Sequence, residues 1–229
     1  MKKRQLRIAA GVFAGVLLIV GAVGLLTQTL GNLADPTYSG QTFTYWKEQL
    51  EKGDAGASNK AIEIINTLVI PDLVNTMFHD TYDSKLRLGA IDALNGLPGI
   101  EIKYIDADGR RSSAAWALGE LGPAAKTAIP ELIKALESKD PVLQKPSISS
   151  LGRIRSEPEK VIPLLIPYLA NDNLDVPAAG ALAEFGSLSK AAVPKLIPLL
   201  KSREKDDVAA AKAALKKIDP IAAAEAGVK

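Results

Sequence analysis

Apolar residues recur along the C-terminal half of the chain at one long, fixed spacing. The paired positions are Leu118 and Leu121, Leu151 and Ile154, Leu182 and Phe185, and Leu215 and Ile218, at offsets of 33, 31 and 33 residues. A second landmark, an apolar residue followed by proline, recurs at Ile129-Pro130, Ile162-Pro163 and Val193-Pro194, with the same offsets of 33 and 31. Two landmarks that share one period predict a protein built from stacked repeats.

Each unit of this period has the pattern of two helices. Apolar residues at helical spacing follow each proline, at Leu132, Ile133 and Leu136, then Leu165, Ile166 and Leu169, then Leu196, Ile197 and Leu200. The segment before each proline is rich in Ala, Gly and Ser, as at residues 178–183, so that two helices can approach closely. Neither helix can bury its apolar stripe alone, so stacked pairs are expected to form a continuous core.

The helical pattern extends toward the N-terminus, where it is weaker. Residues 43–50 have the pattern of an amphipathic helix that covers the first repeat, with Tyr45 and Trp46 as its core side chains rather than as a membrane-interface belt or a ligand platform. Residues 57–68 are expected to form a first helix, and its partner should begin after Pro71. Residues 83–97 should form the next first helix, with Leu94 and Leu97 in the column of Leu118 and Leu121.

The three full units of the array read ALGELGPAAKTAIPELIKAL, SLGRIRSEPEKVIPLLIPYL and ALAEFGSLSKAAVPKLIPLL. They resemble HEAT repeats, specifically the short HEAT-like units named after phycobilisome lyases, and the resemblance covers roughly residues 45–229. It implies an all-α fold, an α-solenoid of about five helical-hairpin repeats. Tetratricopeptide arrays share the period, but the sequence shows no convincing run of their Trp, Gly-Tyr and Pro landmarks.

A membrane anchor is predicted ahead of the repeats. Residues 1–7 are basic, and residues 8–26 form an uncharged run of 19 residues. As a helix this run would span about 28 Å, close to the thickness of a bilayer core. It is longer than the apolar core of a signal peptide and lacks a clear Ala-x-Ala site, which favours an uncleaved anchor over secretion after cleavage. The basic flank predicts a cytoplasmic N-terminus and an extracytoplasmic repeat domain, periplasmic in a Gram-negative cell.

This assignment divides the chain into a basic tail at 1–7, a transmembrane signal anchor at 8–26, a linker at 27–42 and the repeat domain at 43–229. Within the anchor, Gly11 and Gly15 form a GxxxG spacing that can bring two membrane helices into contact. Glycine is also frequent elsewhere in this segment, so the motif supports no more than a weak self-association.

Charge and composition narrow the function. Without the four basic residues of the tail, the chain has 24 basic and 26 acidic residues, whereas a nucleic-acid-binding domain usually has a basic surplus. There is no cysteine and only one histidine, His79, which has no readable Ser or Cys partner. We therefore expect no cofactor, no metal site and no catalytic residue, and no nucleic-acid partner.

One segment breaks the repeat pattern. Residues 98–110 alternate apolar and polar positions in part and bring together three acids, Glu101, Asp106 and Asp108. The alternative function is a small-molecule or cation binder, or a lyase-like enzyme, that uses this segment. The simpler interpretation is a degenerate helix with a solvated Asp-Ala-Asp-Gly turn, because the further oxygen ligands and closing Glu of a calcium loop are missing.

The remaining interpretation is a non-catalytic scaffold that binds a protein through the surface of its stacked second helices. The polar residues expected to face solvent there are Glu131, Lys134, Lys195 and Lys201. Because they carry charges of both signs, a protein partner fits them better than a polyanion.

Overall fold

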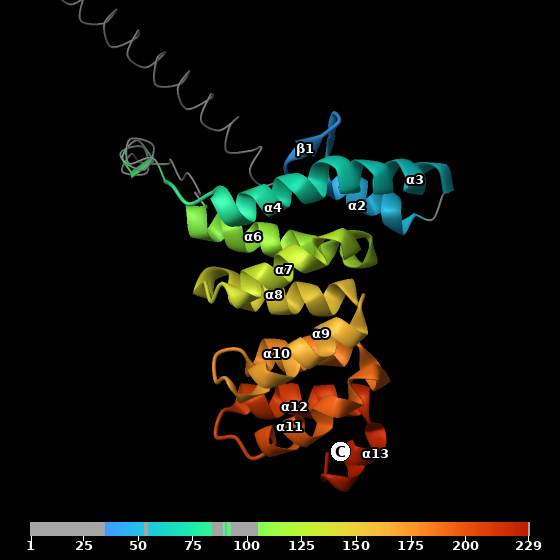
Figure 1. The fold of residues 1–229 in the computed structure, drawn as a ribbon, viewed down its shortest axis with the longest axis vertical. Helices are drawn as coiled ribbons and strands as arrows, with labels where there is room; N and C mark the ends of the chain where they lie inside the picture. The colour runs from blue at the N-terminus through green and yellow to red at the C-terminus, as the bar shows by residue number, and fades with distance from the viewer. Residues whose placement is uncertain (1–34, 53–54, 84–88, 90, 93–104, 229) are drawn as a thin grey trace, which may run out of the picture. The chain divides into compact units, whose positions relative to one another are not determined.

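The computed structural model describes residues 35–52, 55–83, 89, 91–92 and 105–228 (Figure 1). The chain divides into two compact units. The first comprises residues up to Glu48 together with Ser84–Tyr104, and the second comprises Gln49–Asp83 and Ile105 onward. The predicted anchor at 8–26, with Gly11 and Gly15, lies outside the described residues.

The first unit contains a small hairpin where a linker was expected. Strands β1 (Thr37–Tyr38) and β2 (Gln41–Thr42) pair antiparallel, and Ser39 and Gly40 turn the chain with positive φ angles of 52° and 77°. Two left-handed residues suit a two-residue hairpin loop. Helix α2 (Phe43–Glu51) follows, and its Trp46 is buried, with its indole Nε1 donating to the Tyr38 carbonyl at 2.7 Å. The prediction of core residues in this helix is therefore confirmed for Trp46 and wrong for Tyr45, which is 38% exposed.

The second unit opens with one continuous helical stretch, and the hairpin predicted around Pro71 is wrong. Helix α3 (Ala55–Ile64) runs through a π-helical turn, η1 (Ile65–Val69), into α4 (Ile70–His79). The amide of Ile70 donates to the carbonyl of Ile65, a bond one residue longer than in an α-helix. Proline lacks an amide donor and clashes with the preceding turn, and a π-helical turn just before it lets the helix continue.

Beyond α4, helical pairs follow one another in a row (Figure 1). The first helices, α6 (Ala107–Glu120), α8 (Pro141–Ile154), α10 (Asp175–Glu184) and α12 (Lys205–Ile218), pack each on the next, and α4 packs directly on α6. The second helices are α7 (Ile129–Glu137), α9 (Pro158–Leu165) and α11 (Val193–Leu199). Short 3-10 segments η2 (Gly122–Ala128), η3 (Ile166–Ala170) and η4 (Gly186–Ala192) connect them, and α13 (Pro220–Glu225) ends the array.

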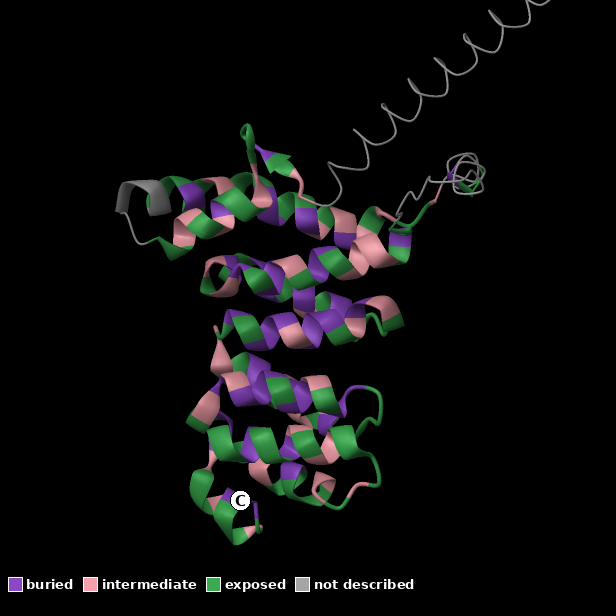
Figure 2. Ribbon diagram, turned by 180° about the vertical axis from the view of Figure 1, so that it is seen from behind, coloured by how far each residue is buried: buried purple, intermediate pink, exposed green. Residues whose placement is uncertain are grey.

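The core of this stack is the set of positions that define the sequence period. Each first helix buries one pair of them, so buried and exposed residues alternate along the helices (Figure 2). The buried pairs are Leu118 and Leu121, Leu151 and Ile154, Leu182 and Phe185, and Leu215 and Ile218. The repeat register predicted from the sequence is thus confirmed over α6 to α12. Leu94 and Leu97 of the expected helix at 83–97 lie outside the described residues.

Small residues let the first helices approach closely. A Cβ on Gly119 would lie 2.9 Å from the Cα of Ser150, and a Cβ on Gly152 would lie 2.5 Å from the Cα of Ala181. The hydroxyl of Ser150 also donates across the contact to the carbonyl of Ala115 at 2.7 Å. The Ala, Gly and Ser content of these helices is therefore a requirement of packing.

The turns between paired helices also follow the period, with one exception. Gly122 and Gly186 end their first helices with φ angles of 54° and 56°, and Arg155, at the equivalent position, has a φ of 49°. In that middle unit the second helix begins at Pro158, so Ile162-Pro163 lies inside α9 and does not open it as expected. Glycine is the usual residue at a left-handed helix end, so Arg155 is strained there.

One described helix, Asn59–His79, is long and apolar enough to cross a membrane by length and composition. A core helix of a soluble protein passes the same test, and this one buries Leu73 and Met77 and packs on α6. It is therefore weak evidence for a membrane span, and it is not the segment predicted from the sequence.

Candidate functional site

The acids of the irregular segment have structural roles where they are described. Asp106 is the N-cap of α6, and its carboxylate accepts from the amide of Gly109 at 2.7 Å. Asp108 lies in the first turn and pairs with Arg111 at 3.4 Å. Residues 106–110 therefore begin a helix and do not form an isolated turn. Glu101 lies outside the described residues.

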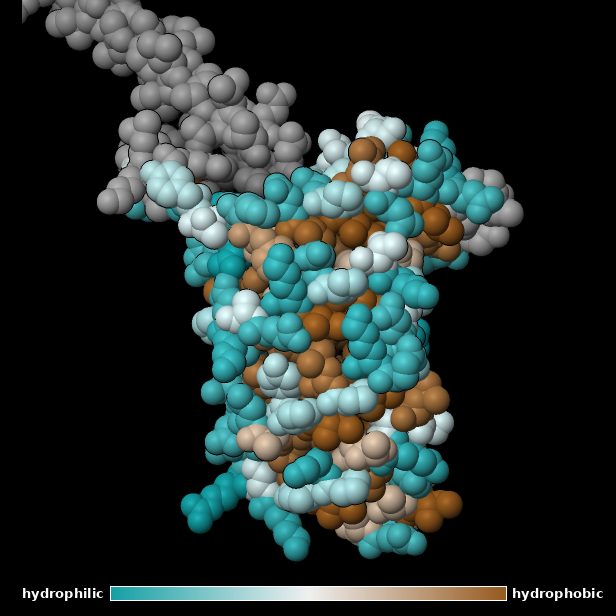
Figure 3. Space-filling view, in the orientation of Figure 1, coloured by the Kyte–Doolittle hydropathy of each residue, from teal (hydrophilic) through white to brown (hydrophobic). Residues whose placement is uncertain are grey.

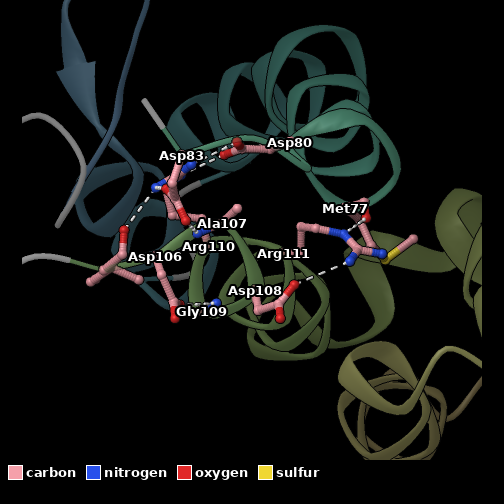
Figure 4. Close-up of polar contacts among 10 residues, drawn as sticks. Met77, Asp80, Asp83, Asp106, Ala107, Asp108, Gly109, Arg110 and Arg111 are labelled. Carbon is pink, nitrogen blue, oxygen red and sulfur yellow. Dashed lines mark hydrogen bonds and ion pairs between the residues drawn. The ribbon is translucent and has the colours of Figure 1, made fainter. Parts of the chain in front are cut away.

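Arg110 is held by a set of acceptors at the end of α4 (Figure 4). Its guanidinium makes a two-pronged contact with Asp80, with Nε to Oδ2 at 2.5 Å and Nη2 to Oδ1 at 2.7 Å. It also reaches Asp83 at 3.1 Å and the carbonyl of Ile105 at 2.7 Å. A second oxygen of Asp83 accepts from the amide of Ala107 at 2.8 Å, so the chain leaves this corner at Asp83 and returns to it at Ile105.

The neighbouring Arg111 joins three helices. Its Nε donates to the carbonyl of Met77 in the last turn of α4 at 3.0 Å, and its Nη2 pairs with Asp140, whose carboxylate also caps α8. Its side chain is only 12% exposed. Both arginines and their acids are therefore used in joining helices, which leaves little of this cluster to bind a ligand.

The four residues predicted on the second-helix surface do not form one cluster. Glu131 and Lys134 lie together on α7, with Oε2 and Nζ 3.9 Å apart, and the Lys134 ammonium lies 4.9 Å from the centre of the Phe78 ring. Lys195 lies on α11, and Lys201 follows that helix. The α9 unit separates the two groups along the stack. Lys134, Lys195 and Lys201 are exposed, as predicted.

Two larger hollows lie on the first helices of the pairs and not on the second helices. A hollow of about 890 Å³ and an adjoining one of about 390 Å³ share Trp116, Ser149 and Pro177 in their linings. We call the two together the first-helix groove. The face of the stack that Figure 3 shows also has apolar residues at its surface, between hydrophilic ones.

Trp116 is the main apolar side chain of the groove. It lies on α6 and is 40% exposed, although tryptophan is usually well buried. The Arg153 guanidinium, from α8, lies over its ring with Cζ 5.6 Å from the ring centre and also pairs with Glu120. These contacts hold the indole at the surface, available to a further apolar group.

The far end of the groove is acidic. Five carboxylates line it, from the loops before α10 and α12 and the first turns of those helices, and Lys145 is the one basic side chain that the described residues place there. The acids are Asp172, Asp175, Glu204, Asp206 and Asp207. Among the described residues, none of these five forms an ion pair with a basic side chain.

Asp175 is the most constrained of these acids. It is only 3% exposed, and its Oδ1 accepts from the amide of Val176 at 2.7 Å. Burial raises the pKa of Asp175, and the charge of the nearby Asp207 acts in the same direction. Asp207 in turn accepts from the hydroxyl of Ser202 at 2.6 Å. Within the part of the chain that the structure describes, two carboxyl groups therefore lie together without an ion pair to a basic side chain.

The described residues show no constellation for metal binding. No group of three or more His, Cys, Asp or Glu residues among them could hold a metal ion. His79 is exposed at the end of α4, where its Nδ1 lies 3.2 Å from the carbonyl of Asn75 in the preceding turn. The histidine is thus engaged with the backbone of its own helix.

Sequence reasoning missed the groove, although two signals pointed to it. Trp116 is a lone aromatic residue in the small-residue run AAWALG, and such a run has little space to bury it. The acidic segments at 172–175 and 204–207 span the starts of successive first helices. In a repeat array, equivalent segments of successive units lie next to each other on the same side of the stack. Their carboxylates could therefore have been expected to meet.

Comparison with known proteins gives a family match to part of the chain. Residues 106–179, from the N-cap of α6 into α10, match the family model of HEAT repeats, which supports the resemblance drawn from the sequence. A search of curated proteins gives no match. Among solved structures, the chain is similar to an engineered protein from the Northeast Structural Genomics Consortium, with 21% sequence identity and a TM-score of 0.42 over 81% of this chain and 85% of that one.

Proposed function

We propose that the protein is a membrane-tethered, exported scaffold that binds a protein partner and has no catalytic activity of its own. The observation that carries this proposal is the first-helix groove, which crosses α6, α8, α10 and α12 and is open to solvent along the stack. HEAT repeats generally mediate protein–protein interaction, and the matched segment contains most of the groove's middle part. A solenoid offers such an extended surface more readily than an enclosed pocket.

The membrane tether rests on residues 8–26, the uncharged run behind a basic tail. In this proposal the tail stays in the cytoplasm and the repeats, of the short HEAT-like type, are exported. The spacing of Gly11 and Gly15 would allow weak pairing of two anchors.

Two surfaces of the scaffold are candidates for the partner. The first-helix groove combines an exposed tryptophan with acids that pair with no basic side chain among the described residues, and buried aromatic anchors commonly supply most of an interface's affinity. The second-helix residues Glu131, Lys134, Lys195 and Lys201 form a more scattered polar surface. We place the main contact in the groove. The small-molecule alternative gains no support from Asp106 and Asp108, because both are engaged in capping and pairing.

The tether is testable because the chain has no cysteine. Single cysteines at Gln5 and Ser187 would be treated with a membrane-impermeant maleimide in intact cells or spheroplasts. The proposal predicts labelling of Gln5→Cys only after lysis, and labelling of Ser187→Cys, on η4, before it. Labelling of both only after lysis would show that the repeats stay inside the cell.

The interaction is tested in the same membranes by photo-crosslinking. A photoreactive side chain would replace Ser149 in the groove, Lys195 on the second-helix surface, or exposed Lys126 between the paired helices as a control. The proposal predicts a discrete crosslinked protein that is strongest from Ser149 and absent from Lys126. If no position gives a protein-specific product, the scaffold function is wrong.

A further inference from the structure

The middle part of the first-helix groove and its end between α10 and α12 differ in chemistry. Trp116, Ser149 and Pro177 form a mostly apolar middle part, while the end between α10 and α12 holds five carboxylates and, among the described residues, only Lys145 to oppose them. The chain after residue 34 carries nearly balanced charge, so this local surplus of acid is a property of the groove and not of the surface as a whole.

Although Lys145 lines the acidic end, no described basic side chain forms an ion pair with its carboxylates. Asp175 is buried against Asp207, and no basic side chain pairs with either. A buried carboxyl group without a cation or enough donors is costly, and a bound cation would relieve that cost. Acids elsewhere are treated differently, since Asp80 and Asp140 each pair with an arginine.

A metal ion does not fit this end, because no group of three or more metal-binding side chains among the described residues has the required arrangement. An ammonium or guanidinium group needs no fixed coordination sphere and can be shared by several carboxylates. An extended peptide segment that bears such a group could also place an apolar side chain against Trp116.

We propose that the first-helix groove binds a basic segment of a partner protein, with Lys or Arg side chains at the Asp175–Asp207 end and an apolar side chain on Trp116. This inference rests on the proposed scaffold function and specifies the chemistry of its partner. Charge complementarity of this kind mainly speeds association and selects the partner, and the aromatic contact adds affinity.

The test uses the full chain in nanodiscs made of neutral lipid and three labelled peptides, Lys-Lys-Phe-Lys-Lys, Glu-Glu-Phe-Glu-Glu and Lys-Lys-Ser-Lys-Lys, with binding followed by fluorescence polarisation. We expect the first peptide to bind most tightly and the acidic one not to bind. Asp207→Asn should weaken the two basic peptides by about tenfold, and Trp116→Ala should weaken only the phenylalanine peptide by a similar factor. Glu159→Gln, at an exposed position of α9, is the matched control and should change nothing.

Equal binding of the basic and acidic peptides, no binding of any, or unchanged binding by Asp207→Asn would overturn the proposal. Circular dichroism of each variant shows whether it is folded. If a variant unfolds, the salt dependence of the unsubstituted chain decides, because charge-driven binding must weaken as ionic strength rises. The proposed function fails separately: a protein crosslinked from Ser149 that lacks a basic segment would refute this inference and leave the scaffold intact.

Discussion

The Cα of Ala181 lies 2.5 Å from the position that a Cβ on Gly152 would occupy. This contact joins α8 to α10, and both residues belong to the small-residue columns of the repeat. The backbone of a neighbouring helix cannot move aside as a flexible side chain can. The spacing of the first helices, and with it the width of the groove that crosses them, therefore depends on single missing methyl groups.

Gly152→Ala should destabilise the protein by about 1–3 kcal/mol, because α8 and α10 must separate to admit the methyl group. Gly180→Ala is the matched control, since Gly180 lies in α10 and a Cβ added there would meet nothing within 4 Å. It should instead stabilise by about 0.5–1 kcal/mol through better helix propensity. Urea unfolding of both variants measures the difference, and stabilisation at both sites would show that the helices are not in close contact.

Arg155→Gly should stabilise the protein by about 0.5–1 kcal/mol. The change removes the strain of a side chain on a left-handed residue, and this gain exceeds the entropy that the more flexible glycine loses on folding. The reverse change, Gly122→Ala, isolates the same effect, since Gly122 has a φ of 54° and open space around its Cβ position. It should destabilise by a similar amount. Thermal melts of the two variants that shift in the same direction would contradict this explanation.

Asp175 should make stability depend on pH. Its raised pKa means that the folded protein holds a proton that the unfolded chain has released, so the free energy of unfolding falls as pH rises from about 3.8 through the raised value. Asp175→Asn keeps an oxygen to accept from Val176, and it should raise stability near neutral pH and flatten this part of the profile. Chemical denaturation across the pH range measures it, and an unchanged slope would mean that another group is responsible.

Leu118, Leu151 and Leu182 should be equivalent core residues. All three are fully buried at the same position of successive first helices. Truncation of any one to Ala should destabilise the protein by about 2–5 kcal/mol, with the spread set by how far each cavity collapses. Denaturant unfolding of the three variants measures these losses, and values below about 0.5 kcal/mol at all three would show that the repeat register is wrong.

The sequence predicted best what depends on spacing alone. The buried column from Leu118 to Ile218 follows from a period that the units from α6 to α12 share. Local exceptions were harder to predict. Pro71 signals a helix start in most contexts, but here a π-helical turn just before it lets the helix continue.

The groove was missed for a different reason. Trp116, Asp175 and Asp207 are far apart in sequence, and their meeting depends on how the helices stack. Of the polar residues chosen on the second helices, Lys134, Lys195 and Lys201 are exposed and Glu131 is half-buried, and α9 separates Lys134 from Lys195. A repeat pattern shows which residues face outward, whereas the depth of a hollow depends on neighbouring helices and loops.

The most direct test of the central claim is partner recovery by the full chain in its own membranes. Crosslinked partner would be quantified by mass spectrometry for Trp116→Ala in the groove and for the charge reversals Lys134→Glu and Lys195→Glu on the second-helix surface, with each variant checked for unchanged helix content. We predict that Trp116→Ala reduces recovery by about tenfold or more, and that the charge reversals change it little. Full recovery by Trp116→Ala, with loss in the charge-reversed variants, would contradict it.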